Sequence, residues 1–186
     1  MLDATLLVLA GGASRRMGRP KALLPVAGTT LVGYVAGRLG PRFKEVLVAA
    51  SDPALVPAGL TQVPDLHPGL GPLSGIEAGL QAAGTDRIFA VACDLPRITV
   101  ELAALVVGRS EGHQVAVPIV DGRPQPACAC YRKSTLSAVA DALERGRLKV
   151  ADLLQDLDVE WVVGLDPNLF WNINTPEDYQ VFLSGL

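Results

Sequence analysis

The sequence has few cysteines, histidines and aromatic residues. Its 186 residues include 3 cysteines and 2 histidines, and aromatic side chains make up 5% of the chain. An odd cysteine count without secretory features argues against structural disulfides. No C-x-x-C pair is present and neither histidine lies near a cysteine, which excludes the usual spacing of zinc ligands. Because Cys93, Cys128 and Cys130 stand in apolar runs, we expect buried, reduced thiols.

A surplus of positive charge is also absent. Lysine and arginine number 16 against 19 acidic residues, which gives a formal net charge of -3. A broad nucleic-acid-binding surface needs a basic excess, so nucleic acid is not an expected partner.

Long apolar runs are missing at the start of the chain. Asp3 stands where a secretory signal would carry basic residues, and the first apolar run ends at Gly11. A membrane span needs about 20 apolar residues. We therefore expect a cytoplasmic protein that does not enter a membrane.

The chain does show a regular alternation of predicted strands and helices, which we assign to one domain over residues 1–186. Apolar runs predict strands over residues 5–9, 45–50, 87–93, 114–120 and 127–131. Helical spacing and capping residues predict a helix after Thr99 and helices over residues 30–39, 73–83, 134–145, 149–157 and 176–183. This alternation is typical of a three-layer α/β fold with a mostly parallel central sheet. Ligands bind such sheets beyond the carboxyl ends of the strands, so the loops after Leu9 and Cys93 are the expected site.

A glycine-rich, basic turn follows the first predicted strand. Consecutive backbone amides in such a turn form an anion-binding concavity, and arginine pairs with phosphate oxygens bidentately. The spacing matches neither the G-x-x-x-x-G-K-[ST] loop nor the G-x-G-x-x-G fingerprint. We expect a bound triphosphate; the alternative is an ordinary glycine turn with a solvated basic rim. The glycines are Gly11, Gly12 and Gly18, and the cations are Arg15, Arg16, Arg19 and Lys21.

A single acid, Asp94, follows the buried strand predicted over residues 87–93. A carboxylate at the end of such a strand is costly unless it is paired or bound to a cation. Phosphate chemistry commonly uses Mg²⁺, which needs only one or two protein carboxylates. We expect Asp94 to bind Mg²⁺; the alternative is that it caps the turn that follows.

Two further segments carry groups that suit a nucleotide site. Asp65 precedes a second glycine-rich loop, over residues 69–75, and is suited to accept a hydrogen bond from a ribose or a base; it is otherwise an ordinary turn residue. Asn172 and Asn174 precede a helix that Thr175 is expected to cap. Their spacing suits contact with a ligand or a metal, but it is also a normal helix entry.

Together these residues resemble the molybdenum cofactor guanylyltransferase family. The run Leu9-Ala10-Gly11-Gly12, with Ser14, Arg16-Met17-Gly18 and Lys21, looks like its nucleotidyltransferase signature. Residues 71–76, 93–96 and 172–176 match three more of its motifs in the same order. The resemblance implies a Rossmann-like nucleotidyltransferase fold. It also implies that the terminal phosphate of molybdopterin attacks the α-phosphate of GTP and releases pyrophosphate.

With this resemblance, we predict a site that holds GTP, molybdopterin and Mg²⁺. Asp94 is the predicted metal ligand. Docking proteins from the same pathway are possible partners, and a monomer is expected. The predicted catalytic residues are Lys21, Asp94 and Arg16; the nucleotide-binding residues are Leu9, Ala10, Gly11, Gly12, Ser14, Arg15, Lys21, Asp65 and Asp94; and the substrate-binding residues are Gly71, Ser74, Asn172 and Asn174.

Three other functions remain open at this point. Residues 19–25 resemble the related cytidylyltransferase branch, which uses CTP, and Ser51 stands near where some family members carry an asparagine. The Gly11-Gly12 pair and residues 71–75 favour GTP. A regulatory module that binds GTP without turnover, and a sugar-1-phosphate nucleotidyltransferase, which usually has a longer chain, are the other two.

Overall fold

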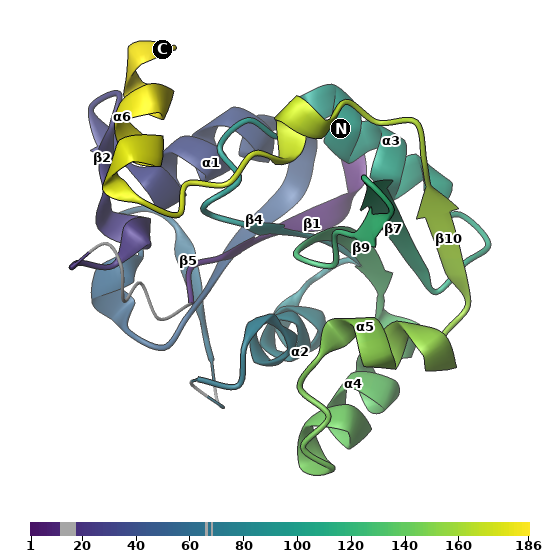
Figure 1. Cartoon of the computed structure of the whole chain (residues 1–186). Helices are drawn as coiled ribbons and strands as arrows, with labels where there is room; N and C mark the ends of the chain where they lie inside the picture. Colours follow the sequence, from purple (N-terminus) through teal and green to yellow (C-terminus); the bar gives the residue numbers. More distant parts are fainter. Residues whose placement is uncertain (12–17, 66, 68) are drawn as a thin grey trace.

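The computed structural model describes residues 1–11, 18–65, 67 and 69–186 (Figure 1). Its centre is a sheet with the strand order β10-β7-β9-β6-β1-β4-β5, and β8 pairs with β7. Only β8 and β9 run antiparallel to their neighbours among these strands. The strands are β1 (Leu2–Leu9), β4 (Phe43–Ala50), β5 (Thr61–Pro64), β6 (Arg87–Ala92), β7 (Val115–Val120), β8 (Arg123–Pro124), β9 (Cys128–Arg132) and β10 (Val159–Val162).

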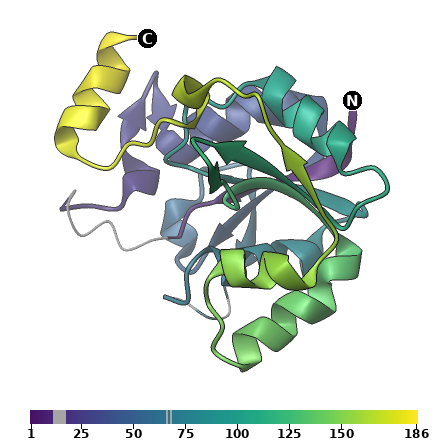
Figure 2. The ribbon, with the colours of Figure 1, turned by 45° about the vertical axis from the view of Figure 1, so that its right-hand side comes forward.

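Helices cover both faces of the sheet, which confirms the three-layer α/β fold (Figure 2). Alternate residues of β1 point to opposite faces, as the pleat of a strand requires. Leu6 and Val8 pack with α1 (Leu31–Leu39) and α3 (Val100–Arg109). Leu7 and Leu9 pack on the other face, with α2 (Pro72–Ala82), α4 (Leu136–Glu144) and α5 (Val150–Leu153).

Close packing of α2 against β1 depends on two glycines. A Cβ atom on Gly79 would lie 2.3 Å from Leu7 Cδ2, and one on Gly75 would lie 3.0 Å from Leu9 Cδ2. A larger residue at position 79 would force the buried Leu7 side chain or the helix itself to shift within a close-packed core. The glycines therefore set the distance between this helix and the strand that leads into the glycine-rich turn.

The predicted strands and helices are confirmed with small shifts of their bounds. Thr30 and Thr99 cap α1 and α3 by accepting hydrogen bonds from the amides of Gly33 and Leu102. The helix expected over residues 149–157 is instead α5 followed by a 3₁₀ turn, Leu154–Asp156. The edge strands β5 and β10 were not predicted from the sequence, nor was the hairpin of β2 (Pro25–Val26) and β3 (Thr29–Thr30). These strands have two to four residues, too few to show a clear apolar period.

A small third core fixes the C-terminal part of the chain. Here α6 (Pro176–Ser184) lies beside β2 and α1 in both views (Figures 1 and 2). Thr175 caps α6, as the sequence predicts, and the structure adds a reciprocal bond from the Thr175 amide to Asp178, which completes a capping box. The Tyr179 hydroxyl donates to the Pro25 carbonyl oxygen. The buried residues of this core are Leu24, Val26, Leu31, Ile173, Tyr179 and Phe182.

The three cysteines are free and buried, which confirms the expectation for the thiols. Burial raises the pKa of Cys93 to about 12 and that of Cys130 to about 11. Within the described ranges, no helix has the length and apolar character that crossing a membrane requires.

The capping box gives a test of the C-terminal core. Hydrogen bonds from the Asn174 and Thr175 amides lower the pKa of Asp178 in the folded protein. Its charge therefore stabilises the fold above the unfolded-state pKa, and this contribution is lost as the pH falls through the lower folded-state value. We expect Asp178→Asn to lower the melting temperature by a few degrees at pH 7, and the difference from the parent to shrink below about pH 4.

Thermal unfolding followed by circular dichroism measures both effects. Glu177→Gln removes a charge from the same helical turn without touching the capping box, and we expect it to change the melting temperature less. A deficit of the same size at pH 7 and pH 3 would contradict the role given to the Asp178 charge.

Candidate functional site

The candidate site lies where β1 and β6 end side by side. The two strands are parallel, and Leu9 pairs with Ala92 at the end of the ladder. The Cys93 amide donates to the Leu9 carbonyl oxygen at 3.1 Å, so the chain stays paired as it enters the Asp94 turn. The loops that follow Leu9 and Cys93 therefore meet at the carboxyl edge of the sheet, as the sequence analysis predicts.

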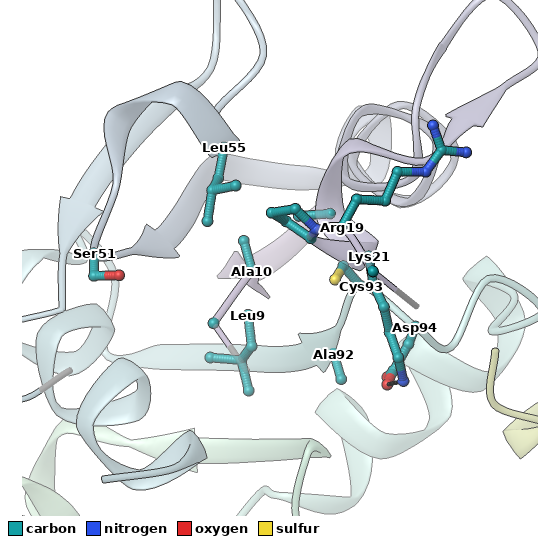
Figure 3. Close-up of a pocket in the computed structure, with 13 residues that line it drawn as sticks. Leu9, Ala10, Arg19, Lys21, Ser51, Leu55, Ala92, Cys93 and Asp94 are labelled. Atoms are coloured by element: carbon teal, nitrogen blue, oxygen red, sulfur yellow. Dashed lines mark hydrogen bonds and ion pairs between the residues drawn. The ribbon is translucent and has the colours of Figure 1, made fainter. Parts of the chain in front are cut away.

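Two adjoining pockets open at this edge. The larger, with a volume of about 580 Å³, lies between the ends of β1, β4 and β6 (Figure 3). The second, of about 360 Å³, shares Leu9, Gly11, Ser51 and Ala92 with the first. Asp65 and Gly71 line the second pocket. The larger pocket is lined by Leu9, Ala10, Gly11, Gly18, Arg19, Pro20, Lys21, Ala22, Ser51, Leu55, Ala92, Cys93 and Asp94.

Lys21 contacts two other predicted site residues, which come from separate segments of the chain. Its Nζ lies 3.0 Å from Asp94 Oδ2 and 2.9 Å from Asn174 Oδ1. The Lys21 and Asp94 side chains are only 17% and 24% exposed, so solvent screens their attraction less than at an open surface. Figure 3 shows both side chains reaching toward each other, whereas the Arg19 guanidinium points away from them.

The C-terminal segment reaches the site through its backbone. The Ile173 amide donates to the Asp94 carbonyl oxygen at 3.0 Å. Asn174 follows directly and places its amide oxygen on Lys21. Asn172, by contrast, donates from Nδ2 to the Phe170 carbonyl oxygen at 3.1 Å and lines neither pocket. The structure thus brings Asn174 to Lys21 and Asp94 and keeps the Asn172 amide on its own segment.

Asp65 is held in place by its neighbours. Its Oδ1 accepts hydrogen bonds from the Ser74 hydroxyl and from the His67 amide. Ser74 is 1% exposed and lines neither pocket. A Cβ atom on Gly11 would lie 3.7 Å from Asp65 Oδ2. Ser74, predicted to bind substrate, therefore contacts Asp65, and Asp65 faces the start of the glycine-rich turn.

The remaining predicted residues divide into two groups. The backbones of Leu9 and Ala10 belong to the sheet edge, where the Ala10 amide donates to the Ala49 carbonyl oxygen at 2.9 Å. Gly12, Ser14, Arg15 and Arg16 lie outside the described residues, so their predicted roles stay predictions.

One arginine near the site was not predicted from the sequence. Arg38, at the end of α1, donates from Nη1 to the Pro96 carbonyl oxygen at 2.6 Å. This bond holds the Asp94 turn from the side of α1. An arginine near the C-terminus of an apolar helix carries no sequence signal for a partner 58 residues away.

The oxygen atoms at Lys21 suit a hard cation. Among residues 1–11, 18–65, 67 and 69–186, no cluster of three or more His, Cys, Asp and Glu side chains is placed to hold a metal. Asp94 Oδ2 and Asn174 Oδ1 nevertheless both lie within hydrogen-bond distance of one cationic nitrogen. A carboxylate and an amide oxygen, completed by substrate phosphates, fit the coordination habits of Mg²⁺.

Comparison with known proteins places the chain in a family. A family model described as a MobA-like NTP transferase domain matches residues 6–161. This chain belongs to that family. A relative from Pelotomaculum thermopropionicum, named as a probable molybdenum cofactor guanylyltransferase, is 41% identical over 96% of this chain and 91% of its own length. The molybdenum cofactor guanylyltransferase of Cereibacter sphaeroides is 38% identical over 92% of this chain and 91% of its own.

A solved structure supports the same assignment. Molybdopterin-guanine dinucleotide biosynthesis protein A from Archaeoglobus fulgidus superposes with a TM-score of 0.82 at 25% identity, and 97% of each chain is covered. The MobA-like chain is therefore a nucleotidyltransferase, and the Rossmann-like nucleotidyltransferase fold that the motifs imply is confirmed.

The Lys21 geometry predicts a loss of triphosphate binding when this cation is removed. We expect Lys21→Ala to weaken binding of a nucleoside triphosphate by ~10–100-fold, because a hydrogen bond to a charged group is lost. Isothermal titration calorimetry measures the dissociation constant. Lys44→Ala is the matched control, since Lys44 pairs with Asp3 near the start of β4, at the opposite edge of the sheet. An unchanged dissociation constant in Lys21→Ala would remove this residue from the site.

Proposed function

We propose that this chain transfers GMP from GTP to the terminal phosphate of molybdopterin and releases pyrophosphate. The observation that carries the proposal is the convergence of Asp94 and Asn174 on Lys21, beside a pocket that Lys21 and Asp94 line together with Gly11 and Gly18. Family membership and the names of the relatives support the same reaction.

Positioning and charge neutralisation supply most of the rate in phosphate transfer. In the proposed reaction Lys21 binds triphosphate oxygens and neutralises the negative charge that develops as pyrophosphate leaves. Asp65, fixed by Ser74, accepts a hydrogen bond from the nucleoside. The attacking phosphate is already largely ionised near neutral pH. A general base is therefore unnecessary, in keeping with the position of His67 and His113 outside both pockets.

Asp94 and Asn174 provide the oxygens that would hold Mg²⁺. When bound, this ion acts as a Lewis acid that stabilises charge on the α-phosphate oxygens. The task of the protein is to keep the two oxygens together, and the Ile173–Asp94 backbone bond serves that purpose. We therefore propose Mg²⁺ as the cofactor and Asp94 as its ligand.

One assay distinguishes GTP from CTP as the substrate and distinguishes an enzyme from a regulatory module that only binds GTP. Pyrophosphate release is measured with molybdopterin, with and without Mg²⁺, for each of the four nucleoside triphosphates. We expect Mg²⁺-dependent release with GTP at a rate well above that with CTP. Preferential release with CTP would move the chain to the cytidylyltransferase branch. Tight GTP binding without release in the presence of acceptor would identify a regulatory module.

Asp94→Asn tests the carboxylate directly. The substitution keeps the size of the side chain but removes its charge, and we expect turnover to fall by about 100-fold or more while the melting temperature stays close to that of the parent. Asp86→Asn is the control, because Asp86 pairs with Arg132 beside the start of β6, away from the pockets. Near-normal turnover of Asp94→Asn would show that the carboxylate is assigned wrongly.

We also propose that the protein is a monomer, that it binds docking proteins of the same pathway, and that it is cytoplasmic. Light scattering on the purified protein measures the oligomeric state.

A further inference from the structure

A cation–π contact joins the two segments that meet at the site. The guanidinium carbon of Arg97 lies 4.4 Å from the centre of the Trp171 ring, and both residues are half-buried. Arg97 follows the Asp94 turn, and Trp171 begins the run that leads to Asn174. A planar guanidinium stacks on an indole in a way that a lysine ammonium does not reproduce.

The same two segments are bonded at a second point. The Ile173 amide donates to the Asp94 carbonyl oxygen, and the Ile173 side chain is fully buried in the C-terminal core. The segments are thus paired by a backbone bond at Asp94 and by a ring contact at Arg97. The family model ends at residue 161, so Trp171 and Ile173 lie beyond the part of the chain that the model matches, whereas Asp94 and Arg97 lie within it.

The Asp94 turn has an additional support that the C-terminal segment does not share. Arg38 of α1 donates to the Pro96 carbonyl oxygen at 2.6 Å. Loss of the Arg97–Trp171 contact therefore leaves the turn attached to α1 and the sheet. The expected consequence is a change in how the Trp171–Asn174 run sits against the turn, with the global fold retained.

We propose that Arg97 and Trp171 are a positioning pair that keeps Asn174 beside Asp94 while Lys21 binds the triphosphate. Lys21 links Asp94 to Asn174 through its ammonium, which has three donors. Phosphate oxygens that accept hydrogen bonds from the Lys21 ammonium weaken its bonds to Asp94 and Asn174. This happens when the side-chain oxygens of Asp94 and Asn174 have to lie together. The ring contact does not involve Lys21, so it persists. This inference rests on the proposed function, and neither residue of the pair touches a reacting atom.

The kinetic test uses four variants and one control. We expect Trp171→Ala, Arg97→Ala and Arg97→Lys to lower kcat and to raise the Mg²⁺ concentration for half-maximal pyrophosphate release, each by about tenfold. The KM for GTP should stay within about twofold, because Lys21 and Asp65 are untouched. Trp171→Phe retains a ring and should recover most of the loss. Trp161→Ala, on edge strand β10, removes the other tryptophan and should leave all three quantities unchanged.

A double variant tests whether Arg97 and Trp171 act as a pair or contribute independently to turnover. If Arg97 and Trp171 act together, Arg97→Ala combined with Trp171→Ala should be no worse than either single variant. Losses that multiply, an unchanged Mg²⁺ requirement, or an equal loss of GTP affinity would each overturn the proposal.

A spectroscopic readout tests the pair without any reaction. Trp161→Phe leaves Trp171 as the single tryptophan of the protein. Adding Arg97→Ala uncovers one face of the Trp171 ring, and we expect acrylamide quenching of its emission to rise about twofold in the absence of substrates. Unchanged quenching would overturn the contact, whatever the activity. Increased quenching in a protein whose parent releases no pyrophosphate with GTP would uphold the contact and overturn the proposed function instead.

Discussion

The Lys21 ammonium is shared by the Asp94 carboxylate and the Asn174 amide oxygen, and the site depends on this arrangement. The three residues come from the loop after β1, the turn after β6 and the segment before α6. Each of these segments is fixed by its own contacts: Leu24 in the C-terminal core, Cys93 on the end of β1, and Ile173 on the Asp94 turn. The Lys21 ammonium then meets the side-chain oxygens of two residues, Asp94 and Asn174, whose backbones are already in place. Little conformational entropy therefore remains to be lost when these residues bind a ligand.

An apolar sheet explains why these polar groups gather at one edge. Residues of β1 are buried against helices on both faces, and charged groups cannot be placed among them without a large desolvation cost. The parallel strands β1, β4, β5 and β6 all end at the same edge, where backbone groups and short loops meet solvent. Gly75 and Gly79 let α2 lie close to β1, and this brings Ser74 within reach of Asp65. The packing of the core thus places the second pocket beside the first.

Local sequence signals succeeded where the physical cause is itself local. Thr30, Thr99 and Thr175 cap the helices for which they were predicted, because a hydroxyl three residues before a free amide needs no tertiary partner. The strands β5 and β10 were missed because each has only 4 residues and lies at an edge of the sheet. Ser74 was predicted to bind substrate from its place in a glycine-rich loop. Its burial and its bond to Asp65 follow from the packing of α2, which no short motif encodes.

The sequence by itself determined the class of fold, the edge of the sheet that carries the site, and the pairing of a basic loop with one acid. These follow from apolar runs, turn residues and charge, all of which are properties of neighbouring residues. Only the tertiary structure decided that Asn174 and not Asn172 reaches Lys21, that Arg38 holds the Pro96 carbonyl oxygen, and that the Arg97 guanidinium lies over the Trp171 ring. Those contacts join residues far apart along the chain. Their geometry depends on how three separate cores pack, because a side chain can meet a distant partner only where the backbones of both have been fixed.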